Sequence, residues 1–208
     1  SVLAQNMEGV AQGWLVLELT NSPLLLGLTG LAFAIPTIAL TLLGGVIAER
    51  ADRRRIMIPS QSFSALTFLL LALLIVFERV ALWHVMVAAF ASGCVRAFDR
   101  PSRMALLPQM VPKEDIPNAV AVGGTIWQLN RLVGPALAGI LIYLIGIGPT
   151  YLFCVGASLV AVGLWLGIRV KAAAATAGSG GVMEHMAEGL NFIRGNEVFF
   201  MFIALIFF

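Results

Sequence analysis

Three polar side chains that could exchange a proton or hold a polar substrate lie in the first apolar stretch of the chain. Gln5, Glu8 and Gln12 are three and four residues apart, so they share one face of a helix. A polar stripe is costly in lipid, and we expect this face to look into a helix bundle or a water-filled cavity. Counted back from an outer end near Leu19, Glu8 lies near the bilayer midplane. A carboxyl group there could take up and release protons, because burial favours its neutral form and a nearby cation its charged form.

Arg131 is the cation that could partner Glu8. It lies near the middle of a later apolar stretch, residues 117–145. A lone charge at that depth costs about 2.5 to 3.5 kcal/mol on insertion scales. We therefore predict that Glu8 and Arg131 face each other or a shared watery cavity. The pair could couple proton binding to a conformational change, or it could be a static ion pair that fixes helix register, and the sequence leaves both open.

Other kinds of chemistry find no support in the sequence. There is no Gly-x-x-x-x-Gly-Lys-Ser loop, so nothing suggests ATP as an energy source, and there is no HExxH motif, histidine cluster or Ser/His/Asp set. We expect no catalytic residue, no metal site and no cofactor, and the chain is not predicted to be an enzyme. Cys94 and Cys154 fall in apolar stretches, where thiols are more often packing residues than disulfides.

The composition indicates an all-α polytopic membrane protein. Of the 208 residues, 60% are hydrophobic and only 12% are charged, which is too apolar for a soluble domain of this length. Six apolar stretches approach or reach the length of a membrane-spanning helix: residues 1–19, 24–48, 56–77, 81–97, 117–145 and 150–168. The third of these, 56–77, has few polar groups beyond serine and threonine, and we expect a lipid-facing packing helix there.

The placement of positive charge predicts the topology. Of the 13 lysines and arginines, all but Arg79 and Arg131 fall in or beside the segments that follow the second, fourth and sixth stretches. Basic residues mark the cytoplasmic side, so a cytoplasmic N-terminus and six spans are expected, in the plasma (inner) membrane. The basic residues follow one side of the membrane and not one face of a domain, so nothing indicates nucleic-acid binding.

A charged segment between the second and third stretches has a recognisable spacing. It comprises Gly45, Glu49, Arg50, Asp52, Arg53 and Arg54. The pattern Gly-x-x-x-acid-Arg-x-x-Arg-Arg resembles the loop between helices two and three of the major facilitator superfamily. Glu49 stands where aspartate is usual, and Asp52 where glycine, which adopts positive φ most freely, is usual. The resemblance implies a gating loop that holds two helix ends and clamps the two transporter halves in the outward-open state.

The stretch 117–145 carries a second motif, Arg131-x-x-Gly134-Pro135-x-x-x-Gly139. Its Gly-Pro-x-x-x-Gly core resembles the fifth-helix motif of antiporters in this superfamily. Pro135 removes a backbone donor and kinks a helix, and Gly134 and Gly139 permit close packing. The resemblance implies a tight seal against the first helix near the external side, although an ordinary kinked packing helix would carry the same residues.

The segment between the fourth and fifth stretches indicates one branch of the superfamily. Residues 99–103 and 107–115 look like the corresponding loop of a drug- and siderophore-exporter branch, similar to transmembrane secretion effectors. Members of that branch with an arginine deep in the fourth helix use it in substrate or proton work. Arg96 is the nearest candidate here.

These features together predict the N-terminal half of a transporter built from two inverted three-helix repeats. Residues 1–170 would form the six-helix half, 171–194 a cytoplasmic linker with an amphipathic helix, and 195–208 the start of a seventh span. The expected function is proton-coupled efflux of a small amphipathic molecule, such as a drug-like compound or a siderophore. Its expected partners are the lipid bilayer, protons, that small-molecule substrate and a missing C-terminal half. The alternative is a non-transporting half-length module for membrane assembly or interaction.

Overall fold

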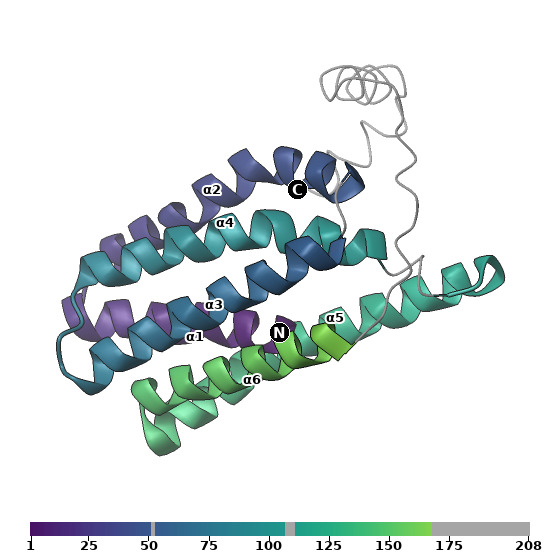
Figure 1. Ribbon diagram of the computed structural model, residues 1–208. Coiled ribbons are helices and arrows are strands. Elements are labelled where there is room, and N and C mark those ends of the chain that lie inside the picture. The colour runs from purple at the N-terminus through teal and green to yellow at the C-terminus, as the bar shows by residue number, and fades with distance from the viewer. Residues whose placement is uncertain (51–52, 107–110, 168–208) are drawn as a thin grey trace, which may run out of the picture. The chain divides into compact units, whose positions relative to one another are not determined.

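The computed structural model describes residues 1–50, 53–106 and 111–167, and within these ranges every regular element is helical (Figure 1). Six long helices follow one another along the chain: α1 (Val2–Thr20), α2 (Pro23–Arg50), α3 (Arg53–Val76), α4 (Leu82–Leu106), α5 (Ile116–Ile145) and α6 (Ile147–Gly167). A short 3-10 turn, η2 (Lys113–Asp115), precedes α5. The predicted all-α fold with six helices is therefore confirmed.

Tight turns join several of these helices into antiparallel hairpins. Helix α1 ends at Asn21, whose left-handed backbone (φ 48°) lets its N–H bond to the carbonyl of Leu17. Glu78 has φ 56° in the turn after α3, and Gly146 has φ 85° in the single-residue link between α5 and α6. The turn requires glycine at residue 146, because residues with a side chain rarely adopt this backbone conformation.

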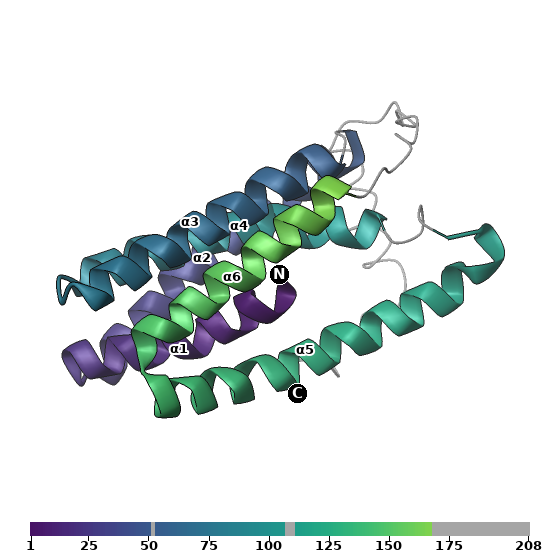
Figure 2. The same cartoon turned by 60° about the horizontal axis from the view of Figure 1, so that its bottom comes forward.

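The pattern of helix contacts divides the bundle into two equivalent halves. Helix α4 is contacted by α2 and α3. In the same way, α1 is contacted by α5 and α6, and α3 and α6 pack on each other. Figure 2 shows α5 beside α1. If α1, α2 and α3 exchange labels with α4, α5 and α6, the same helix contacts result. Gln12 reaches Val85 and Gln5 reaches Asp99, so α1 and α4 run antiparallel. These relations are those of two inverted three-helix repeats.

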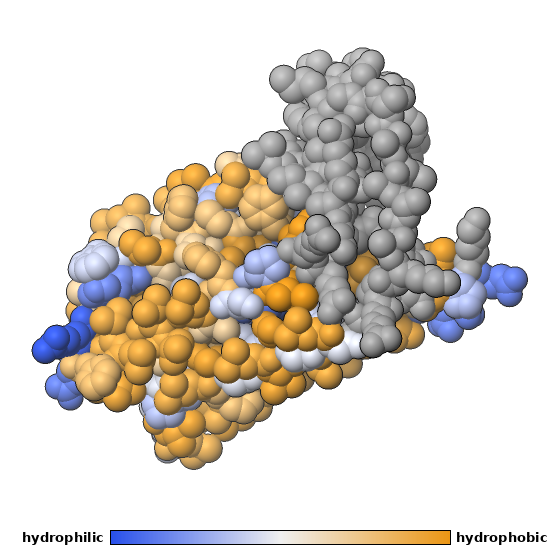
Figure 3. Space-filling view, in the orientation of Figure 1, coloured by the Kyte–Doolittle hydropathy of each residue, from blue (hydrophilic) through white to orange (hydrophobic). Residues whose placement is uncertain are grey.

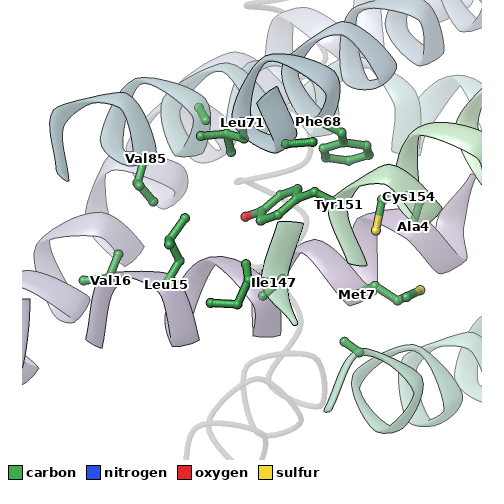
Figure 4. Close-up of a cluster of buried hydrophobic side chains, with 14 residues drawn as sticks. Ala4, Met7, Leu15, Val16, Phe68, Leu71, Val85, Ile147, Tyr151 and Cys154 are labelled. Atoms are coloured by element: carbon green, nitrogen blue, oxygen red, sulfur yellow. The ribbon is translucent and has the colours of Figure 1, made fainter. Parts of the chain in front are cut away.

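The apolar core lies where α1, α3, α4 and α6 meet. Phe68 of α3 and Tyr151 of α6 are fully buried, with ring centroids 6.4 Å apart, and Met7 of α1 is also fully buried (Figure 4). Large buried side chains from three helices fix the relative positions of α1, α3 and α6. The polar residues discussed below are held on this framework.

The outer surface of the bundle is apolar. Four of the described helices contain stretches long and apolar enough to cross a membrane: Pro23–Thr41, Ile56–Val76, Ile116–Ile145 and Ile147–Gly167. The face seen in Figure 3 is hydrophobic over its middle, with hydrophilic residues toward both ends. Helices α1 and α4 are long but more polar, because they carry the charged residues that the bundle buries.

The expected end of the fourth helix is wrong. Helix α4 does not end near residue 97 but continues to Leu106, so Arg100 and Arg103 lie on a helix and not in a loop. An ion pair one turn apart, between Asp99 and Arg103, supports that last part of the helix. Helix α3 has the exposed apolar face expected of a lipid-facing packing helix, with Phe63, Leu66 and Leu70 on it. Its other face is buried in the bundle and carries Gln61 and Phe68.

Several expectations lie outside the described residues. These are the linker at 171–194, the seventh span at 195–208, and Asp52 in the charged segment.

Candidate functional site: a polar seam between the repeats

The polar stripe of α1 faces α4 across the centre of the bundle. We call the facing set the polar seam, and it consists of Gln5, Glu8 and Gln12 of α1, Gln61 of α3, and Ser92, Arg96 and Asp99 of α4. Gln12 Nε2 donates to the carbonyl of Val85 at 3.3 Å, and Gln5 Nε2 donates to Asp99 Oδ2 at 3.5 Å. The seam thus joins the first helices of the two repeats.

Glu8 is the enclosed carboxylate of the seam. Only 4% of it is exposed, and it accepts a hydrogen bond from the Ser92 hydroxyl. Arg96, one turn further along α4, interacts electrostatically with Glu8. In the part of the chain that the structure describes, the two groups make no ion pair, so Arg96 acts on Glu8 as a nearby positive charge and the hydrogen bond to Glu8 comes from Ser92.

Arg96 is held on several sides. Its Nη2 donates to the carbonyl oxygen of Gln5 at 2.6 Å, and its guanidinium lies over the ring of Phe33 at 5.3 Å from the centroid. Its buried Nε–H has no hydrogen-bond acceptor among the described residues. Arg96, which the family resemblance suggested as a site residue, therefore contacts both α1 and α2 within the polar seam.

Asp99 connects three helices at the next level of the seam. It is 3% exposed and accepts hydrogen bonds from Gln61 Nε2 at 3.0 Å and from Arg103 Nη2 at 3.1 and 3.2 Å. Sequence reasoning missed Asp99, Gln61 and Ser92 as site residues. A signal was present, since Ser92, Arg96, Asp99 and Arg103 recur at helical spacing on one face of α4.

The structure does not bring Glu8 and Arg131 together. Arg131 is exposed and makes no ion pair with any residue the structure describes, while Glu8 is buried against α4. Helix α5 packs on the side of α1 that carries Asn6. Residues two apart on a helix point about 200° from each other, so Glu8 turns away from α5. The similar depth of Glu8 and Arg131 in their helices therefore does not bring the two side chains into contact.

The two glycines of the α5 motif lie in different surroundings. Gly134 is buried against α1, and a Cβ atom on it would stand 2.7 Å from the Cβ of Asn6. Gly139 is exposed, and a Cβ there would meet nothing within 4 Å. Pro135 lies inside the helix between them. Among the described residues, the close approach of α5 to α1 thus depends on Gly134.

The charged segment after α2 is described only in part. Gly45, Glu49 and Arg50 belong to the last turns of α2, and Arg53 and Arg54 to the first turn of α3, while the side chains of the four charged residues lie outside the description. A Cβ on Gly45 would meet nothing within 4 Å. The closest helix approach in this region is instead made by Gly44, against the carbonyl of Ala97.

No group of three or more potential metal ligands of the His, Cys, Asp or Glu type occurs in the described ranges. The seam is built from carboxylates, amides, a hydroxyl and a guanidinium, which can bind and pass protons and hold polar groups. It lies between two inverted helical repeats in an apolar bundle. That architecture is the one found in halves of secondary transporters.

The chain belongs to the major facilitator superfamily, in the family described as transmembrane secretion effector, whose model matches residues 1–208. The members are transporters and not enzymes.

Individual relatives agree with this membership. The chain is 32% identical over 140 residues to the uncharacterized MFS-type transporter YfiS of Bacillus subtilis, covering 67% of this chain and 32% of the relative. It is 26% identical over 163 residues to the staphyloferrin A transporter of Staphylococcus aureus, covering 78% and 41%. It is 28% identical over 196 residues to the multidrug efflux pump Tap of Mycolicibacterium fortuitum, covering 88% and 47%. The chain spans a third to a half of the length of these relatives.

Proposed function

We propose that this chain supplies one half of a proton-driven exporter of small amphipathic molecules. The names of its relatives, which include a staphyloferrin A transporter, a multidrug efflux pump and a macrolide efflux protein A, support export of such compounds. Glu8 would bind the proton, and Arg96 would stabilise its ionised form. Protonation of Glu8 would release Arg96 from that attraction, which shifts the balance between conformations that hold the arginine differently.

The observation that carries this proposal is the enclosure of Glu8. Glu8 lies within a membrane-spanning bundle, is hydrogen-bonded to Ser92 and is near a half-buried arginine. Burying a carboxylate there costs free energy, and such residues usually have a functional role, here proton binding. Gln5 and Gln12, on the same face of α1, would hold polar groups of the substrate or water beside the proton site.

Proton flux in proteoliposomes tests the proposal. The full-length protein is reconstituted with an internal pH-sensitive dye, and a macrolide gradient is applied. We expect the macrolide to drive proton movement, and Glu8→Gln to reduce that flux at least tenfold while keeping the size-exclusion profile and helicity. Glutamine keeps an acceptor for the Ser92 hydroxyl, so the change removes mainly the titratable proton.

The matched control is Glu18→Gln, which neutralises an exposed carboxylate on the same helix. It should leave macrolide-driven proton flux unchanged. Equal flux in the wild type and a well-folded Glu8→Gln protein would remove Glu8 as the proton carrier. Macrolide movement that ignores the pH gradient in the wild type would reject proton coupling itself.

The same proposal includes an orientation and two gates. The distribution of arginine and lysine supports a cytoplasmic N-terminus in the plasma (inner) membrane, so that the turn at Asn21 faces outward. A single cysteine placed at Asn21, in a background without Cys94 and Cys154, should then react with an impermeant maleimide in intact cells. The segment containing Glu49, Arg50, Asp52, Arg53 and Arg54 would clamp the cytoplasmic side, and Gly134–Gly139 would seal the external side against α1.

A further inference from the structure

Two exposed arginines lie on helices α4 and α5. In the part of the chain that the structure describes, Asp99 pairs with Arg103, and Arg96 lies near Glu8 without making an ion pair with it. Arg100 of α4 and Arg131 of α5 make no ion pair with the described residues, and both are exposed. An arginine in a membrane protein that is not paired within the protein is stable where water or an anion reaches it.

The indole ring of Trp127 contacts Arg100 and lies on the same helix as Arg131. The guanidinium of Arg100 lies over Trp127 of α5, 5.0 Å from the ring centroid. Arg131 follows Trp127 by one helical turn, which places their Cβ atoms roughly 6 Å apart on the same face. Gly134, which packs on α1, continues that face. Trp127 and Arg131 therefore lie on the same side of α5 as the residue that contacts α1.

The depth of Arg131 excludes lipid headgroups as its natural partner. Arg131 lies 15 residues from the start of α5 at Ile116 and 14 from its end at Ile145. At 1.5 Å per residue it is roughly 21 to 23 Å from either end. The half-thickness of the hydrocarbon core is only about 15 Å, so headgroup phosphates stay well away from the middle of this helix. An anion at Arg131 would have to come from the aqueous path.

We propose that Arg100, Trp127 and Arg131 form a substrate site for amphipathic molecules that carry a carboxylate. The guanidinium groups would bind the carboxylate through paired N–H donors, and the indole face would take the apolar body of the molecule. This inference rests on the proposed export function and names one class of substrate, distinct from the macrolide used to test proton coupling. It predicts discrimination by charge, with anions preferred to cations of the same size and shape.

The test compares two probes that share one fluorophore. The full-length protein is placed in phosphatidylcholine nanodiscs, and binding of dansylglycine, a carboxylate, and dansylcadaverine, an ammonium, is followed by fluorescence anisotropy. We expect dansylglycine to bind at least tenfold more tightly. Arg131→Gln and Arg100→Gln should each remove most of that preference, Arg131→Lys should retain part of it, and Trp127→Ala should weaken both probes.

Controls separate this site from surface charge and from lipid. Arg79→Gln removes an exposed arginine in the turn after α3 and should leave both affinities unchanged. Adding one-fifth phosphatidylglycerol should not displace dansylglycine. Equal affinities for the two probes in the wild type, or an unchanged preference in both well-folded glutamine variants, would overturn the proposal. Displacement by phosphatidylglycerol would also overturn it and assign the arginines to lipid. Because binding is measured without a pH gradient, these results do not depend on whether Glu8 carries protons.

Discussion

Gly44 of α2 lies against the backbone carbonyl of Ala97 in α4, where a Cβ atom on Gly44 would stand 2.2 Å from the carbonyl oxygen. The residue that would donate to this carbonyl in a regular helix, four positions further on, is Pro101, which has no N–H. A glycine Cα–H facing that oxygen supplies a weak hydrogen bond in its place. The crossing thus joins the end of α2 to the part of α4 that carries Asp99.

The first prediction is that Gly44→Ala destabilises the bundle and Gly45→Ala does not. An added methyl group at residue 44 must push α2 from α4, and overpacking of this kind costs about 1 to 3 kcal/mol. We expect the thermal unfolding midpoint in detergent to fall by roughly 3 to 10 °C. A Cβ on Gly45 meets nothing within 4 Å, so its alanine variant should match the wild type or exceed it slightly. Equal midpoints for both variants would contradict the close crossing.

The second prediction concerns proton leak at the contact between α5 and α1. Gly134→Leu should separate the two helices, because even a Cβ atom at this site stands 2.7 Å from Asn6. We expect a several-fold faster passive proton leak in liposomes without substrate. Gly139→Leu is the matched control, since this glycine is exposed to open space within the described bundle. An unchanged leak in a well-folded Gly134→Leu protein would favour simple packing over sealing.

The third prediction is that Asp99 stabilises the bundle through its hydrogen bonds across helices. Asp99→Ala leaves the buried Nε2 of Gln61 without its acceptor, which costs about 1 to 3 kcal/mol in unfolding free energy. Adding Gln61→Leu removes the orphaned donor and should recover part of that loss. Asp115→Ala, at an exposed carboxylate before α5, should change stability by less than about 0.5 kcal/mol. Denaturant titration in mixed micelles measures all four proteins, and a double variant no more stable than Asp99→Ala would argue against this bond.

The sequence predicts the helices well because apolar length and turn residues are local properties. The expected span 117–145 differs from α5 by one residue, and the turn after α1 lies in the gap between the expected stretches 1–19 and 24–48. The end of α4 could not be placed in this way. Arg100, Pro101 and Arg103 read locally as a basic loop, and only the contacts of Asp99 and Gly44 with other helices show why the helix continues.

The site was predicted only in part, because the spacing of its residues along a helix is local but their contacts with other helices are not. The stripe of Gln5, Glu8 and Gln12 follows from helical spacing, but which neighbouring helix it faces is a tertiary fact. Gln61 gave no local signal beyond one amide in an apolar helix. Arg131 had the right depth to meet Glu8, but depth leaves the direction around the helix axis open, and that direction decided the partner.

The last prediction separates the two possible partners of Glu8 by energetic coupling. If Glu8 and Arg96 stabilise each other, neutralising either one alone leaves a buried charge without its partner, while neutralising both removes the problem. The cycle of Glu8→Gln, Arg96→Gln and the double variant should therefore show a coupling energy of about 0.5 to 3 kcal/mol. The matched cycle with Arg131→Gln should be additive within about 0.5 kcal/mol, because Arg131 is exposed and α5 packs on the other side of α1. Unfolding free energies in one detergent give both values. Coupling with Arg131 and none with Arg96 would restore the pair expected from depth alone and would move the proton site to the contact between α1 and α5.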